Sequence, residues 1–105
     1  MRKMESIDYN KLGKPLWLTL KREWFDMIAS GKKKEEYREI KPYWDVRLNK
    51  DYDFVIFRNG YAKDAPIMYV NLIDIRRGIG DMELGAPEYE VYIIELGDII
   101  HIENY

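Results

Sequence analysis

The sequence predicts an α+β domain: a small mixed or antiparallel β-barrel of about five or six strands, with one or two short helices beside a cleft. Three observations favour this class. Hydrophobic residues make up 47% and aromatic residues 14% of the 105-residue chain, which is enough for a packed core. Most apolar runs are short and bounded by turn residues, as in strands. Helix signals occur in only two segments, both in the first half of the chain.

The domain boundary is predicted near the N-terminus. Residues 1–14 are polar and are expected to form a flexible arm, whereas residues 15–105 are expected to form one domain. The arm does not resemble a signal peptide, and no stretch is long enough to cross a bilayer. Cysteine is absent, which excludes disulfides and thiolate metal sites. We therefore expect a soluble cytoplasmic domain with no cofactor, no metal and no membrane partner; its oligomeric state stays open.

The first predicted strand is LWLTL, residues 16–20, in which three leucines alternate with a tryptophan and a threonine. The period changes in residues 21–30, where Trp24 and Ile28 are four residues apart on one face of a short amphipathic helix. Gly31 follows at the position where a left-handed residue commonly ends a helix. A strand followed by a helix is therefore expected before the charged segment that comes next.

The rest of the chain alternates between strands and loops. The predicted elements are a polar strand (33–39), a helix begun by Pro42 (42–50), an apolar strand (53–58), a long strand, bulged or regular (67–77), and strands at 91–96 and 99–103 separated by a Gly97-Asp98 turn. Loops at 59–66, opened by Asn-Gly, and at 78–90 connect them. Closure of the sheet would protect the apolar strand edges.

Charge is distributed unevenly along the chain, although the net charge is only −2. Residues 1–62 hold 14 Lys/Arg and 10 Asp/Glu, whereas residues 63–105 hold 3 and 9. An anion-binding site is therefore expected in the first part. Chance clustering in so short a chain explains the same asymmetry equally well.

The segment GKKKEEYR, residues 31–38, is the main candidate site. In a strand, Glu36 and Arg38 point to the same face, together with Lys34, whereas Lys33 at the preceding bend can reach either side. A half-buried Glu–Arg pair beside a lysine makes a polar cleft that suits a base or phosphate, or that tunes a pKa for proton transfer. The alternative is a solvated strand whose ion pairs contribute little.

Aromatic and polar residues near this segment are further candidates. Tyr43, Trp44 and Tyr61 offer flat faces on which bases can stack, although aromatic residues of small proteins also serve in core or rim packing. Arg58 and Asn59 end an apolar strand beside a loop, where binding residues are common. For Asn59, a purely conformational role in a hairpin turn stays open.

The charged segment also carries a family resemblance. Gly31, Lys33, Glu36 and Arg38 form the pattern G-x-K-x-x-E-x-R, which resembles the signature of the ASCH domain family, and residues 41–44 resemble the K-x-Y-W that often follows it. The resemblance runs from about residue 15 to the C-terminus. It implies a PUA-like β-barrel with the motif, and by extension Lys41, lining a cleft that binds RNA or a modified nucleotide or nucleoside.

The resemblance also implies an alternative function. One branch with a similar fold hydrolyses acylated cytidine by means of a lysine and a threonine of the motif and a further glutamate. Lys33 matches the lysine, but Glu36 stands at the threonine position and lacks the hydroxyl that would support attack on an amide. One alternative to a binding module is thus a small hydrolase acting on a modified nucleoside such as an acylated cytidine, with Lys33 and Glu36 as candidate catalytic residues. The other is a structural or partner-binding domain in which the charged segment is only a folded edge.

Overall fold

The computed structural model describes residues 11–105, so most of the predicted arm lies outside the described part of the chain. The last residues of the predicted arm already contact the sheet. Leu12 packs against the cluster that contains Phe54, and the backbone N–H of Lys14 donates to Asp53 Oδ2 at 2.7 Å. The sheet therefore holds the chain a few residues before the predicted boundary.

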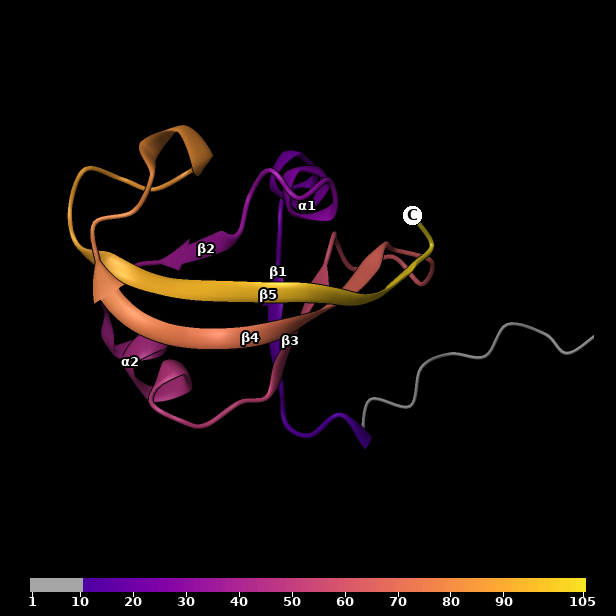
Figure 1. Ribbon diagram of the computed structural model, residues 1–105, viewed down its shortest axis with the longest axis horizontal. Helices are drawn as coiled ribbons and strands as arrows, with labels where there is room; N and C mark the ends of the chain where they lie inside the picture. Colours follow the sequence, from indigo (N-terminus) through magenta and orange to yellow (C-terminus); the bar gives the residue numbers. More distant parts are fainter. Residues whose placement is uncertain (1–10) are drawn as a thin grey trace, which may run out of the picture.

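Five strands form one mixed sheet in the order β1-β3-β4-β5-β2. They are β1 (Pro15–Thr19), β2 (Glu35–Arg38), β3 (Phe54–Arg58), β4 (Ile67–Gly78) and β5 (Val91–Glu103). β1 runs parallel to β3, and all other neighbours are antiparallel. The sheet curls strongly (Figure 1), and because β1 and β2 are its two edges it forms a half-barrel. The predicted α+β class and number of strands are confirmed.

Two helices connect the edges of the curled sheet. Helix α1 (Arg22–Ala29) leads from β1 to β2, and α2 (Pro42–Leu48) leads from β2 back to β3, the neighbour of β1. Both helices bury their apolar faces in the main core, α1 through Phe25 and Ile28 and α2 through Leu48. A short 3₁₀ helix, η2 (Met82–Leu84), lies in the loop before β5.

The main core lies on the inner face of the curl. Alternate residues of the strands contribute to it, together with the helices: Leu16, Leu18, Val55, Phe57, Met68, Val70, Tyr92, Ile94 and Leu96 are its strand members. A second cluster covers the opposite face of β3, where Phe54 and Ile56 pack with Tyr69. Burial on both faces explains why the sequence of β3 is continuously apolar.

The predicted turn at Gly97-Asp98 is wrong, because β5 continues unbroken through both residues. Its partner β4 is also long, and the register between the two strands shifts on either side of Val70. Gly97 lies at this irregularity, where an added Cβ would be 3.3 Å from the side chain of Asn71. The glycine thus permits close strand approach at a bulge.

Candidate functional site

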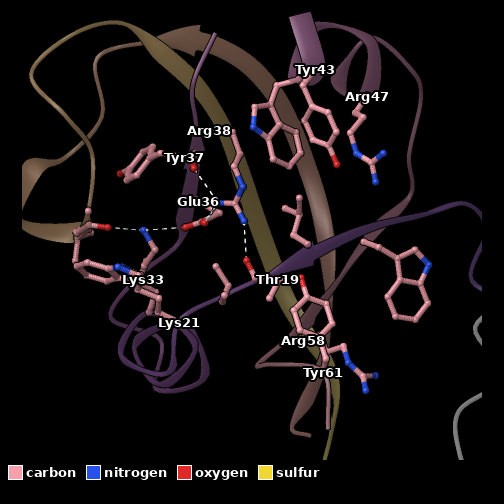
Figure 2. Close-up of a pocket in the computed structure, with 17 residues that line it drawn as sticks. Thr19, Lys21, Lys33, Glu36, Tyr37, Arg38, Tyr43, Arg47, Arg58 and Tyr61 are labelled. Carbon is pink, nitrogen blue, oxygen red and sulfur yellow. Dashed lines mark hydrogen bonds and ion pairs between the residues drawn. The ribbon is translucent and has the colours of Figure 1, made fainter. Parts of the chain in front are cut away.

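The inner face of β2 opens into a cleft between the two edges of the sheet. Glu36 and Arg38 lie opposite Ile94 and Tyr92 of the main core, so they share a face as predicted. Figure 2 shows the side chains that line this cleft. Its volume is about 690 Å³. It is lined by Trp17, Leu18, Thr19, Leu20, Lys21, Trp24, Lys33, Glu36, Tyr37, Arg38, Tyr43, Trp44, Arg47, Arg58, Tyr61, Leu84 and Gly85.

Three charged side chains form a connected network at the base of the cleft (Figure 2). Glu36, which is only 5% exposed, uses both carboxylate oxygens: Oε1 lies 3.3 Å from Lys33 Nζ, and Oε2 accepts from Arg38 Nη1. Two cations therefore share one buried carboxylate. The network carries a net positive charge in a place where water is largely excluded, which strengthens its electrostatic effect.

Lys33 lies just before β2, so the strand alternation that orients Glu36 does not apply to it. The turn after α1 places it, because its backbone N–H donates to Met27 O at 3.1 Å. Its ammonium donates to Leu84 O at 2.5 Å and lies 4.4 Å from the ring centroid of Tyr37. The residue is 1% exposed. Burial, with a smaller contribution from the positive charge of Arg38, lowers the pKa of Lys33 to about 8.

Arg38 joins the two edges of the half-barrel. Its Nη2 donates to the carbonyl of Thr19, the last residue of β1, at 2.9 Å, and its Nη1 donates to Tyr37 O at the same distance. The guanidinium also lies over the ring of Trp44, 5.3 Å from the centroid. Burial lowers the pKa of Arg38 to about 10, so the group stays charged at neutral pH.

Aromatic side chains form much of the cleft wall. Tyr43 meets Trp44 edge-on with centroids 4.9 Å apart, and Arg47 lies over the Tyr43 ring at 4.9 Å. Because Arg38 lies over Trp44, the two rings are packed between two guanidinium groups along one wall. Trp17 and Trp24 also line the cleft, so all three tryptophans of the chain contribute to its wall.

One side of the cleft is formed at the ends of β1 and β3. Arg58 is the register partner of Thr19, and its Nε and Nη2 donate to Gly60 O at 2.8 Å and Ala62 O at 2.7 Å. The Thr19 hydroxyl donates to the Tyr61 hydroxyl at 3.4 Å. Figure 2 shows Arg58 and Tyr61 close together at this side of the cleft, with Thr19 between them and Arg38.

Six of the eight predicted ligand-binding residues line the cleft: Lys33, Glu36, Arg38, Tyr43, Arg58 and Tyr61. Lys41 and Asn59 lie outside its lining. The Lys41 ammonium is 3.8 Å from Glu39 Oε1 on the surface. Asn59 Nδ2 donates to Leu20 O at 2.9 Å, which ties the end of β3 to the end of β1. The side chain of Asn59 is therefore engaged in joining two strand ends.

Sequence reasoning missed several lining residues. Trp17 lies on β1 opposite the core leucines, so the alternation already placed it outside the core, and Arg47 lies one helical turn after Tyr43 on α2. Lys21 and Trp24 gave no comparable signal, because their place depends on how α1 meets β2.

Together the lining side chains include five cations and one carboxylate. All five cations come from the first 62 residues, where the charge distribution predicted an anion site.

Comparisons with protein-family models, with curated proteins and with solved structures found no match for this chain. The likeness to ASCH domains therefore stays a prediction from the motif. Among residues 11–105, no group of three or more His, Cys, Asp or Glu side chains is arranged to hold a metal ion. No helix in the same part of the chain is long and apolar enough to cross a membrane.

Proposed function

We propose that the protein binds RNA or a modified nucleotide or nucleoside in this cleft. The observation that carries the proposal is the composition of the lining, five cationic side chains and one carboxylate among six aromatic residues, in a chain whose net charge is −2. Cations in a groove attract a polyanion, and aromatic faces stack on bases without requiring a particular sequence.

The parts of the cleft suit different parts of such a ligand. Tyr43 and Tyr61 are 56% and 83% exposed and present their rings to an incoming base. Arg38 uses only part of its five-donor guanidinium on Glu36, Tyr37 and Thr19, so further N–H groups are left for a base carbonyl. Shape and stacking would therefore select a base, and the surrounding cations would favour a phosphate backbone.

The test is titration of the protein with short single-stranded RNAs and with nucleosides at low salt. Because all three tryptophans line the cleft, a bound base is expected to quench their fluorescence. Tyr61→Ala should weaken binding by about 1–3 kcal/mol, the usual contribution of one stacked base. The matched control is Tyr105→Ala, which removes a tyrosine that is 60% exposed and absent from the cleft lining. Absence of binding to every RNA and nucleoside at low salt would refute the proposal.

A small hydrolase acting on a modified nucleoside is the second candidate. The observation that favours it is the position of Lys33, whose pKa of about 8 lies near physiological pH and whose ammonium is 3.3 Å from Glu36 Oε1. In such a reaction water would attack the acyl carbon of an acylated nucleoside, the C–N bond would break, and a carboxylic acid and the amine would leave. Release of acid from a panel of acylated nucleosides, compared with Glu36→Gln, tests this. Equal rates for both proteins would reject it.

A further inference from the structure

The loop between β4 and β5 lies against the base of the cleft. It comprises residues 79–90 and rises from the end of the hairpin beside β2 (Figure 1). Its Leu84 carbonyl accepts from Lys33 Nζ at 2.5 Å, and both Leu84 and Gly85 belong to the cleft lining. Gly85 is also close to the Trp24 ring, since an added Cβ would lie 3.2 Å from it. The loop therefore forms one side of the enclosure that leaves Lys33 only 1% exposed.

The two ends of this loop are fixed beside each other. Gly78, at the end of β4, is the register partner of Val91, at the start of β5. Within the loop, the backbone N–H groups of Leu84, Gly85 and Ala86 donate to carbonyls of the same loop. Compact loops of about 6–16 residues whose ends are close are Ω-loops, and they are frequently functional. This loop can thus move as one unit without disturbing the pairing of the sheet.

Few side-chain interactions attach the loop to the rest of residues 11–105. Besides the bond from Lys33, the Asp81 N–H donates to Tyr37 Oη at 3.1 Å. The Tyr89 hydroxyl donates to Glu39 Oε2 at 2.8 Å, and a small apolar cluster around Tyr37 adds to these contacts. The loop has four carboxylates and no Lys or Arg. None of those carboxylates is within ion-pair distance of a cation in the described part of the chain.

The loop borders a second cavity as well as the cleft. This cavity has a volume of about 320 Å³, and its lining includes Pro87 and Tyr89 of the loop. Tyr37 and Gly85 line both the cavity and the cleft. Open space at two places along the loop leaves it few packing contacts to lose, which is typical of segments that open locally at low cost.

We propose that residues 79–90 are a gate over Lys33. In the closed position seen in this structure, Leu84 O takes one N–H of the Lys33 ammonium. Outward movement of the loop frees that N–H for an oxygen acceptor on a ligand. An anionic ligand repels the acidic loop, so its binding favours the open position. The inference goes beyond both candidate functions, because it concerns access to Lys33 and not the identity of the ligand.

The experiment measures how fast Lys33 is acetylated by acetic anhydride in the full-length chain, with the modified lysines located by tandem mass spectrometry. In the native protein Lys33 should react at least about tenfold more slowly than its exposed neighbour Lys34, because only the open position admits the reagent. Tyr37→Phe and Tyr89→Phe each remove one hydroxyl that attaches the loop and keep the ring. Each should raise the Lys33 rate about threefold to tenfold, the factor that one hydrogen bond contributes to an equilibrium.

Tyr105→Phe is the matched control. Tyr105 and Tyr89 are 60% and 56% exposed, and each donates its hydroxyl to a surface carboxylate. Tyr105 donates to Asp26 Oδ1, outside the loop, so the control should leave the rate of Lys33 acetylation unchanged. Tyr89→Phe removes an exposed contact and is expected to fold normally, which keeps the test valid if Tyr37→Phe destabilises the protein.

Amide hydrogen exchange distinguishes movement of the gate from unfolding of the whole chain. In Tyr89→Phe the Asp81 amide keeps its acceptor on Tyr37, so faster exchange at Asp81 would show that the loop moves as one unit. Amides of β3, which lies between β1 and β4, should not change. Acetylation of native Lys33 as fast as Lys34, or a rate that neither loop variant changes, would overturn the gate. A Lys33 rate that rises only together with exchange in β3 would overturn it as well.

Discussion

Replacement of Lys33 by methionine should change how the stability of the fold depends on pH. In the unfolded chain the lysine has an ordinary pKa of 10.5, whereas burial lowers it to about 8 in the folded protein. Between these values the unfolded chain binds more protons than the folded one. The free energy of unfolding of the native sequence should therefore rise as the pH increases through this window.

The size of the effect follows from the two pKa values. The full pKa shift lowers the free energy of unfolding by about 3 kcal/mol at pH values well below 8. Between pH 7 and pH 9.5 the free energy of unfolding should rise by about 2 kcal/mol. Measurements should stop near pH 9.5, because burial raises the pKa of Tyr37 from 10.0 to about 12 and ionisation of the unfolded tyrosine then lowers stability. Lys33→Met has no titrating side chain at this position, so its free energy of unfolding should not show this rise with pH.

Urea unfolding at a series of pH values, followed by tryptophan fluorescence, provides the free energies. A chain of this size is expected to unfold in two states, which makes the comparison direct. Lys34→Met is the matched control, since it removes the neighbouring exposed lysine and should keep the rise. Parallel curves for the native protein and Lys33→Met would show that Lys33 is not held in a low-dielectric site, and the account of the deep network would be wrong.

Three further substitutions test other parts of the structure. Arg38→Leu breaks a buried charge pair and the link between the sheet edges, so it should destabilise the protein by about 3–5 kcal/mol in urea; a loss below about 1 kcal/mol would contradict this. Gly80→Ala places a Cβ 2.5 Å from the Tyr37 ring and should cost about 1–3 kcal/mol; an unchanged melting temperature would refute the packing described. Asn59→Ala loses its bond to Leu20 O and should cost about 1 kcal/mol without weakening RNA binding; a selective loss of affinity would place Asn59 in the site.

Local pattern was sufficient to predict the orientation of the charged strand. Residues two apart in a strand share a face, and this rule placed Glu36 and Arg38 together before any tertiary contact was known. The rule does not apply to Lys33, because this residue precedes β2 and is positioned by the turn after α1. Its burial depends on Leu84, 51 residues further along the chain, and no local pattern reports such a contact.

The shape of the cleft likewise depends on contacts between distant segments. Thr19 and Arg38 meet because α1 connects the two edges of the sheet, and β1 pairs with β3 in parallel across two helices and a strand. Sequence periodicity indicates strands but does not specify their order. The sequence also could not predict that β5 is continuous. A glycine such as Gly97 is typical of a bulge as well as of a turn, so the local pattern does not distinguish the two.

The half-barrel and the cleft have one physical origin. A closed sheet would leave no gap between β1 and β2, whereas here the gap is joined by the side chain of Arg38. Arg38 needs Glu36 beside it because an unpaired buried guanidinium is costly, and Lys33 adds the second cation that leaves the network positive. The same three residues therefore hold the open sheet together and give its opening a net positive charge.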